Sequence, residues 1–408
     1  MKTKLEKYAE LAVIKGANVQ KGQMLVINCP VEHYEFARMC ARVAHEAGAR
    51  NVEVRFNDDQ LNKLAFEHTE TEVLKKISEW VITRQKEAIE HNCAFLHIIS
   101  DQPGLLKDIP AEKLQEVQME MYKEMDQFRY YTTANHGQWS IVALPNVAWA
   151  KKIFTSDSDE VAVQKLEDAI YRSVRIDDEH DPIELWNEHN QSLAKRIKMM
   201  NEYHFDRLHF KNDLGTDLVV ELNPQHIWAG GDETTLKGVH FNPNMPTEEI
   251  FTMPKRTGVN GVVYSTKPLS YQGKLIEDFH IEFKDGKAIS WDAKKEKDAL
   301  TNLIQTDEGS CYLGEVALIS DNSPISNMDI LFLNTLFDEN ASCHLALGSA
   351  YPTNMVDGEK MSKEEMLANE CNVSMTHADF MFGSPCMRIV GKGNNQEVVL
   401  FESGNFVA

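Results

Sequence analysis

The chain of 408 residues lacks the features of several large protein classes. Its formal net charge is −21, because 63 acidic side chains outnumber 42 basic ones. A nucleic-acid or anionic-membrane partner is therefore not expected, since no basic field exists to release counterions. No uninterrupted apolar run approaches the roughly 20 residues that a membrane-spanning helix needs. The amino-terminal segment also lacks the apolar centre of a secretory signal peptide.

Several short motifs are missing as well. The seven cysteines are odd in number and include no C-x-x-C pair. A reducing, cytoplasmic compartment is therefore expected rather than a disulfide framework. The sequence contains neither a G-x-G-x-x-G motif nor a P-loop, so nucleotide binding is not supported.

The length and the order of the apolar segments predict two domains. A chain of 408 residues exceeds what one hydrophobic core usually supports. In residues 1–205, apolar strand-like runs such as Met24–Pro30 and Cys93–Ser100 alternate with helical patterns such as Val31–Ala49. This alternation predicts an α/β domain with an open, mostly parallel sheet.

The second half of the chain has a different pattern of apolar segments and turns. In residues 206–408, short strand-like runs are separated by turn signals, and Lys284–Lys287 reads as a two-residue hairpin turn. We expect an α+β carboxy-terminal domain, with the boundary near residue 205. This domain also contains the residues whose chemistry suggests a function.

The stretch Glu339–Tyr351, ENASCHLALGSAY, holds a carboxylate, an imidazole and a phenol. The preceding apolar residues, from Ile330 to Phe337, have roughly the spacing of a buried helix face. Glu339 and His344 are five residues apart, so a continuous helix would put them on different faces. The helix must end between them if both are to face one centre. The alternative is a helix end with a solvated glutamate.

Glu249 follows Thr247 in the segment NMPTEEIF. Threonine as an N-cap followed by acidic residues is typical of an ordinary helix start, and these residues alone favour that interpretation. Glu315 lies in the apolar run GEVALIS, where a carboxylate must be paired, hydrogen-bonded or metal-bound unless it is exposed at the strand end.

The segment VSMTHADFMFG presents His377 and Asp379 on one face of a predicted strand, opposite a fully apolar face. A metal-free hydrogen-bonded pair is the alternative. Six residues are therefore candidate ligands of divalent metal ions: Glu249, Glu315, Glu339, His344, His377 and Asp379. Four carboxylates and two imidazoles are too many for one structural zinc ion, but they suit two neighbouring ions with a bridging carboxylate. Zn, Co and Mn are all compatible with these ligands.

These segments, together with VNGVVYSTKPLSYQGKLIEDF (residues 259–279), make the chain similar to the metalloaminopeptidases typified by aminopeptidase T and aminopeptidase S. The resemblance extends over the whole chain. It implies a cytoplasmic homodimer that removes amino-terminal residues from peptides, with two metal ions per subunit in the carboxy-terminal domain.

By motif, the resemblance implies one ion held by Glu249, Glu315 and Asp379. The other is then held by Glu315, Glu339, His344 and His377, with Glu315 bridging, and Tyr351 matches the family's site tyrosine. Such a pair of ions would activate a water molecule as nucleophile. Two alternatives remain open from the residues alone. One is a two-metal phosphoesterase with Lys255, Arg256 or Lys267 as phosphate clamps, and the other is a non-catalytic metal-dependent dimer.

Overall fold

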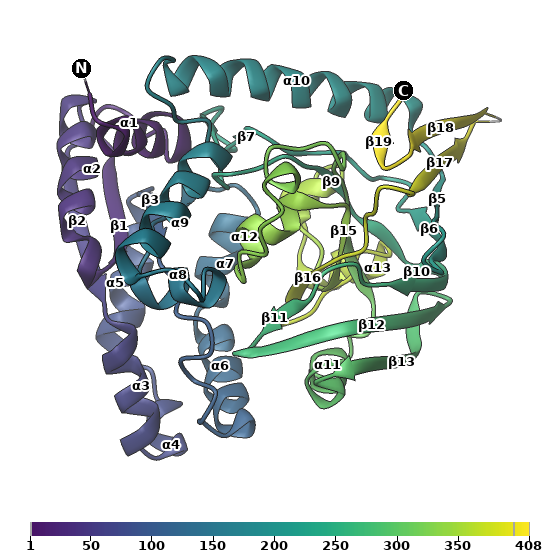
Figure 1. The fold of residues 1–408 in the computed structure, drawn as a ribbon, viewed down its shortest axis with the longest axis horizontal. Coiled ribbons are helices and arrows are strands. Elements are labelled where there is room, and N and C mark those ends of the chain that lie inside the picture. The colour runs from purple at the N-terminus through teal and green to yellow at the C-terminus, as the bar shows by residue number, and fades with distance from the viewer. Residues whose placement is uncertain (1, 395, 408) are drawn as a thin grey trace. The chain divides into compact units, whose positions relative to one another are not determined.

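The computed structural model describes residues 2–394 and 396–407, which form two compact units (Figure 1). The first comprises the chain up to Asn190 together with Gly231–Pro246, and the second comprises Gln191–Gly230 together with the chain from Thr247. Helix α10 (Pro182–Tyr203) carries the chain from the first unit into the second. A domain boundary near residue 205 stays a prediction.

The first unit is built on a parallel sheet in the order β2-β1-β3-β4. Its strands are β1 (Met24–Pro30), β2 (Asn51–Asn57), β3 (Ala94–Ile99) and β4 (Trp139–Ala143). Its helices are α1 (Lys4–Leu11), α2 (Tyr34–Glu46), α3 (Asp59–His68), α4 (Thr71–Leu74), α5 (Glu79–Glu90), α6 (Ala111–Glu124), α7 (Asp126–Thr133), α8 (Val147–Ile153) and α9 (Asp159–Ser173). The parallel pairing of these four strands and the helices between them confirm the predicted α/β unit. The two central strands, β1 and β3, are apolar because the sheet is covered on both faces there, whereas the edge strand β2 is polar and more exposed. A short ribbon of β7 (Glu233–Thr234) and β8 (His240–Phe241) also belongs to this unit.

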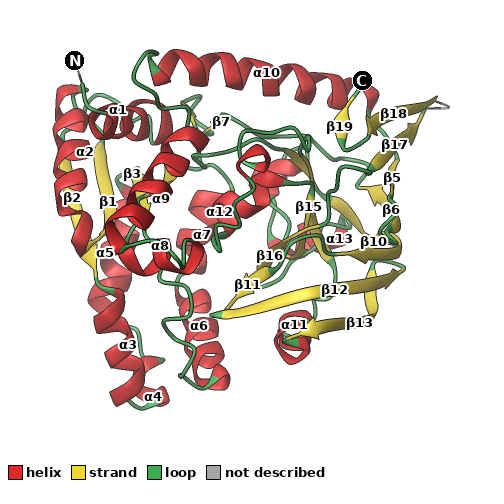
Figure 2. Ribbon diagram, viewed as in Figure 1, coloured by secondary structure: helices red, strands yellow, loops and turns green. Residues whose placement is uncertain are grey.

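The second unit contains two antiparallel sheets (Figure 2). The larger sheet has nine strands: β5 (Arg207–Lys211), β6 (Asp217–Leu222), β10 (Pro254–Tyr264), β11 (Leu269–Tyr271), β12 (Lys274–Lys284), β13 (Lys287–Lys295), β17 (Arg388–Gly393), β18 (Gln396–Glu402) and β19 (Asn405–Phe406). The smaller sheet has the order β16-β15-β14-β9 and consists of β9 (Ile250–Thr252), β14 (Leu313–Leu318), β15 (His344–Gly348) and β16 (His377–Met381). Three helices accompany them: α11 (Lys297–Ile304), α12 (Thr335–Asp338) and α13 (Lys363–Ala368).

The hairpin predicted at Lys284–Lys287 joins β12 and β13. Lys284 pairs with Lys287, and the two loop residues Asp285 and Gly286 have φ angles of 49° and 81°. Positive φ at both loop positions is the type I′ geometry, which matches the twist of the flanking strands.

The helix predicted from the apolar spacing before Glu339 is wrong for most of its length. Only Thr335–Asp338 forms a helical turn, and Leu333 has a φ of 57°. The Asp338 carboxylate accepts hydrogen bonds from the backbone N–H groups of Phe332 at 2.7 Å and Asn334 at 3.1 Å. This side chain competes with the backbone for those donors, as short acidic side chains do near helix ends.

Among the described residues, no helix is both long enough and apolar enough to span a bilayer.

Candidate metal centre

Each strand of the smaller sheet brings candidate ligands to one place. Glu249 directly precedes β9, Glu315 lies on β14, His344 begins β15, and His377 and Asp379 lie on β16. The helix start expected from Thr247 is absent. The backbone N–H of Glu248 instead donates to the side chain of Asn340, and β9 pairs with β14, so tertiary partners override the local signal.

The register of the strands puts the ligands on one face. Ala346 of β15 lies opposite Glu315 on one side and Asp379 on the other. Since side chains alternate across a strand, His344, two residues from Ala346, points to the same face. The other face supplies apolar side chains to the core of the unit: Val316, Leu318, Leu345, Leu347, Ala378 and Phe380. The sheet is therefore apolar on one side and presents ligands on the other.

Glycine is needed where β15 ends. Gly348 lies opposite His377, with a φ of 109°. A Cβ atom at this position would lie 2.2 Å from the carbonyl oxygen of Thr376. A larger residue would therefore push β16 and its two ligands away.

His344 is buried and is oriented by the backbone. Its Nδ1 atom lies 3.0 Å from the carbonyl oxygen of Glu339, and its Nε2 atom lies 3.2 Å from Glu315 Oε1 and 3.1 Å from Glu249 Oε2. Donation from Nδ1 to a carbonyl directs Nε2 at the carboxylates, which is the usual arrangement around a metal-binding imidazole.

His377 is held in the same way. Its Nδ1 atom lies 2.7 Å from the carbonyl oxygen of Ser349, and its Nε2 atom lies 3.3 Å from Asp379 Oδ1 and 3.5 Å from Glu315 Oε2. Both imidazoles therefore present the same nitrogen to the carboxylate group.

Glu315 belongs to both groups of donors. Among the described residues, two sets of three side chains have ligand atoms within 4.8 Å of one another: Glu249, Glu315 and His344, and Glu315, His377 and Asp379. The resemblance implies Glu315 as the shared residue too, but it groups Glu249 with Asp379 and His344 with His377. The distances group each histidine with a different carboxylate.

Glu339 and Tyr351 border these two sets. Glu339 follows α12 in a short 3₁₀ turn that ends before β15, so the chain does change direction between Glu339 and His344, as the site requires. Its carboxylate belongs to neither close set, although it is buried beside Asp379 and Glu249. Tyr351 is extended before Pro352, with a φ of −82° and a ψ of 131°, and its ring lies 4.8 Å from that of His377.

Burial and mutual repulsion raise the pKa of two carboxylates in the cluster, whereas the neighbouring His377 holds the pKa of Asp379 below its usual range. Burial raises the pKa of Glu315 to about 7 and, together with Asp379 and Glu249, raises the pKa of Glu339 well above its usual range. Burial alone would lower the pKa of both imidazoles. The neighbouring carboxylates outweigh this effect of burial. The pKa of His344 therefore rises well above its usual range, and the pKa of His377 rises to about 9. The cluster therefore attracts positive charge.

The donor set fits divalent metal ions. Glu249 Oε2 and Asp379 Oδ1 are buried, and each faces an imidazole nitrogen, His344 Nε2 at 3.1 Å and His377 Nε2 at 3.3 Å. Buried carboxylates gathered in this way cost free energy unless a cation compensates their charge. Together with the two directed imidazoles, these oxygens are the ligands that Zn²⁺, Co²⁺ or Mn²⁺ accept.

Two positioning residues were not found from the sequence. The Asp307 carboxylate accepts from the backbone N–H of Met375 at 2.6 Å and that of Ser310 at 2.8 Å, and Asn372 donates to the carbonyl oxygens of Gly309 and Gly348. They tie the segment before β16 to the end of β15. An Asp-x-x-Ser turn is readable from sequence, but its distant partner is not.

Two of the three cationic residues considered as phosphate clamps are engaged elsewhere. Lys255 pairs with Glu221 at 3.5 Å. The guanidinium of Arg256 lies 3.9 Å from the ring centroid of Tyr312 and contacts Glu308. The Lys255 pair is long and half-exposed, so it is mainly the contacts of Arg256 that weaken the phosphoesterase alternative.

Comparison with known proteins places this geometry in a family. The sequence profile of the thermophilic metalloprotease family (M29) matches residues 1–406. Aminopeptidase AmpS of Bacillus subtilis is 42% identical over 99% of this chain and 98% of its own, and aminopeptidase T of Thermus aquaticus is 37% identical over 93% and 92%. The solved structure of wild-type AmpT from Thermus thermophilus has a TM-score of 0.92 at 35% identity and covers 99% of both chains. The chain therefore belongs to the thermophilic metalloprotease family M29 and is a metallo-aminopeptidase, as its motifs predict.

Proposed function

We propose that the protein is a two-metal aminopeptidase whose ions are held by Glu249, Glu315 and His344 on one side and by Glu315, His377 and Asp379 on the other. One observation carries this proposal: the two oxygens of Glu315 face two different imidazoles, at 3.2 Å and 3.5 Å. A carboxylate placed in this way suits a bridge between two ions. Glu339, buried beside both sets, is proposed as a further ligand.

When bound, the ions would supply an acidified water molecule and a Lewis acid for the peptide carbonyl. The chain's own residues provide the setting. The strands fix the carboxylates, and the carbonyl oxygens of Glu339 and Ser349 fix the tautomer of each imidazole. The core under the sheet resists movement of the ligands.

Tyr351 is proposed to donate a hydrogen bond to the oxyanion that develops on the substrate. Burial, together with Glu315 and Asp379, raises the pKa of its phenol well above the usual value, so the hydroxyl keeps its proton. The rings of Phe251 and His377 both pack against the Tyr351 ring, with centroids 5.9 Å and 4.8 Å away, and restrict its movement. A restrained neutral phenol is a suitable donor to an oxyanion.

The substrate class and the assembly are also proposals. We expect peptides with a free amino terminus as substrates, a cytoplasmic location and a homodimer. The relatives named as aminopeptidases support the first of these.

The proposal is tested with aminoacyl amides and a chromogenic phosphate ester. Chelation should abolish amide hydrolysis, and adding back Zn²⁺, Co²⁺ or Mn²⁺ should restore it without phosphoesterase activity. A peptide should be trimmed stepwise from its amino terminus, whereas its N-acetylated form should stay intact. Full amide turnover by the metal-free protein would contradict the metal site, and cleavage of the acetylated peptide would contradict exopeptidase action.

A further inference from the structure

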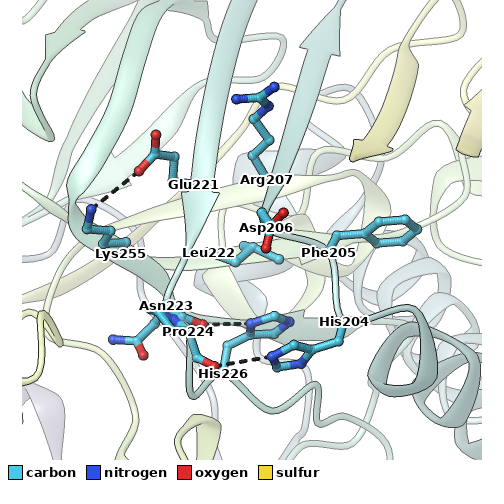
Figure 3. Close-up of a pocket in the computed structure, with 10 residues that line it drawn as sticks. All are labelled: His204, Phe205, Asp206, Arg207, Glu221, Leu222, Asn223, Pro224, His226 and Lys255. Carbon is cyan, nitrogen blue, oxygen red and sulfur yellow. Dashed lines mark hydrogen bonds and ion pairs between the residues drawn. The ribbon is translucent and has the colours of Figure 1, made fainter. Parts of the chain in front are cut away.

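The second unit has a cavity of about 310 Å³ whose lining residues include none of the candidate ligands (Figure 3). Its lining comes from the end of α10, the start of β5, the end of β6 and the loop that follows, and one residue of β10. Those residues are His204, Phe205, Asp206, Arg207, Glu221, Leu222, Asn223, Pro224, His226 and Lys255. A volume of roughly 300 Å³ is the lower limit of small-ligand sites.

Both signs of charge line this cavity. Glu221 and Lys255 form an ion pair at 3.5 Å, with exposed side-chain fractions of 43% and 34%. Arg207 lies opposite Glu221 in the register of β5 and β6, and Asp206 precedes it. A long, half-exposed ion pair is worth little free energy, so a ligand that brings its own opposite charges can replace it at low cost.

One wall of the cavity is rigid. The rings of His204 and His226 lie face to face in Figure 3. Their centroids are 4.5 Å apart and their planes differ by 5°. His226 Nδ1 lies 2.7 Å from the carbonyl oxygen of Asn223, and His204 Nε2 lies 3.2 Å from that of Pro224. Preorganised walls reduce the entropy lost when a ligand binds.

This wall continues into the segment that carries Tyr351. The backbone of His226 bridges to Met355, and the N–H of Ile227 donates to the carbonyl oxygen of Asn354 at 2.7 Å. Asn354 lies three residues after Tyr351. Ala229 and Phe251 exchange two backbone hydrogen bonds, each of 2.9 Å. The strand-like segment 226–229 therefore contacts both the tyrosine loop and the strand that follows Glu249.

We propose that this cavity binds a small zwitterion with the charges of a free α-amino acid, and that its occupancy changes turnover at the metal centre. The ligand carboxylate faces Lys255 and Arg207, and its ammonium group faces Glu221 and Asp206. The backbone hydrogen bonds of segment 226–229 connect the cavity to Tyr351. The effect on turnover rests on the proposed aminopeptidase function, but the binding does not.

Calorimetric titration of the metal-loaded protein with L-leucine tests the binding. A double variant, Glu221→Gln with Lys255→Met, removes both charges with little change in size. A matched control, Glu277→Gln with Lys295→Met, removes an ion pair of 2.8 Å between β12 and β13. We expect a site in the wild type and the control that is about tenfold or more weaker in the double variant, because charged hydrogen bonds are lost. Circular dichroism and metal content should be equal in all three proteins.

Analogues and kinetics complete the test. N-acetyl-L-leucine and L-leucinol each lack one charge, neither is an aminoacyl amide that the enzyme would hydrolyse, and neither should bind at this site. L-leucine should inhibit amide hydrolysis with a mixed pattern in the wild type and a purely competitive pattern in the double variant. Identical titrations and identical inhibition patterns in all three proteins would overturn the proposal. Loss of amide hydrolysis in every protein, with the titration difference retained, would instead contradict the aminopeptidase function.

Discussion

At the scale of single residues, Glu315 is the residue on which the proposed metal centre depends most. Its carboxylate is buried in β14 and directs one oxygen towards each histidine. Because Glu315 belongs to both sets of ligands, its loss would affect both. Each of the other four residues belongs to one set only.

We therefore predict that Glu315→Gln lowers the content of bound metal more than Glu249→Gln does. Glutamine keeps the size of the side chain but removes the negative charge that both proposed ions would require. Elemental analysis after gel filtration measures the effect, with circular dichroism to show that the fold is retained. Wild-type metal content in Glu315→Gln would remove this residue from the site.

For Tyr351 we make a different prediction, because its proposed hydrogen bond to the substrate forms only in the transition state. In Tyr351→Phe, kcat should fall about a hundred- to thousandfold, equivalent to roughly 2.7–4 kcal/mol for one oxyanion donor. KM and metal content should change little. Tyr264→Phe, a change on β10 where the ring stacks on His280, is the matched control and should keep wild-type kcat. An unchanged kcat in Tyr351→Phe would make this a packing residue.

The identities of these residues could be predicted from sequence, but their arrangement could not. Tyr351 is extended as expected because Pro352 restricts its backbone locally. The grouping of His344 with Glu249 depends instead on the pairing of β9, β14 and β15, which are far apart in the chain. The interpretation of Glu249 as part of an ordinary helix start was wrong because of such long-range contacts. The side chain of Asn340, far along the chain, accepts a hydrogen bond from the backbone N–H of Glu248.

At the scale of elements, the smaller sheet leaves space between its ligands. Ala346 lies between Glu315 and Asp379, and directly opposed positions on neighbouring strands have Cβ atoms about 4.5–5.5 Å apart. The small side chain of Ala346, which is fully buried, therefore separates the two carboxylate-bearing positions.

Filling this position should damage metal binding. In Ala346→Val, we expect weaker metal affinity and, from overpacking, about 1–3 kcal/mol of lost stability. Leu347→Val is the control, because Leu347 lies on the apolar face and its shortening should reduce stability while keeping the metal. Titration with a competing chelator compares the two variants. Equal affinity in both would show that the space is not used.

Local elements were predicted best where one short signal decides the geometry. The Asp285-Gly286 turn needs positive φ at both positions, which these residues tolerate. The apolar spacing from Ile330 to Phe337 predicted a helix that is mostly absent. Periodicity takes no account of side chains that accept hydrogen bonds from backbone N–H groups. Asp338 does this for Phe332 and Asn334.

At the scale of the whole molecule, buried neutral histidines predict sensitivity to acid. Burial lowers the pKa of His33, His97 and His226 to about 4. Between the unfolded value of about 6.5 and this folded value, the unfolded chain binds protons that the folded chain does not. Their contribution to stability is therefore present above pH 6.5 and is lost as the pH falls towards 4.

Urea unfolding at several pH values checks this prediction with His97→Asn. The difference in unfolding free energy between wild type and variant should shrink as the pH falls from 7 to 4.5. A difference independent of pH would mean that the His97 imidazole does not titrate on unfolding.

The order of the ligands along the chain has a consequence for biosynthesis. The first ligand, Glu249, and the last, Asp379, are separated by most of the second unit, and the strand that bears the last ligands forms one edge of its sheet. A ribosome-bound chain therefore holds no complete pair of ligand sets until β16 has left the exit tunnel. Binding of both proposed ions would then follow synthesis of nearly the whole chain.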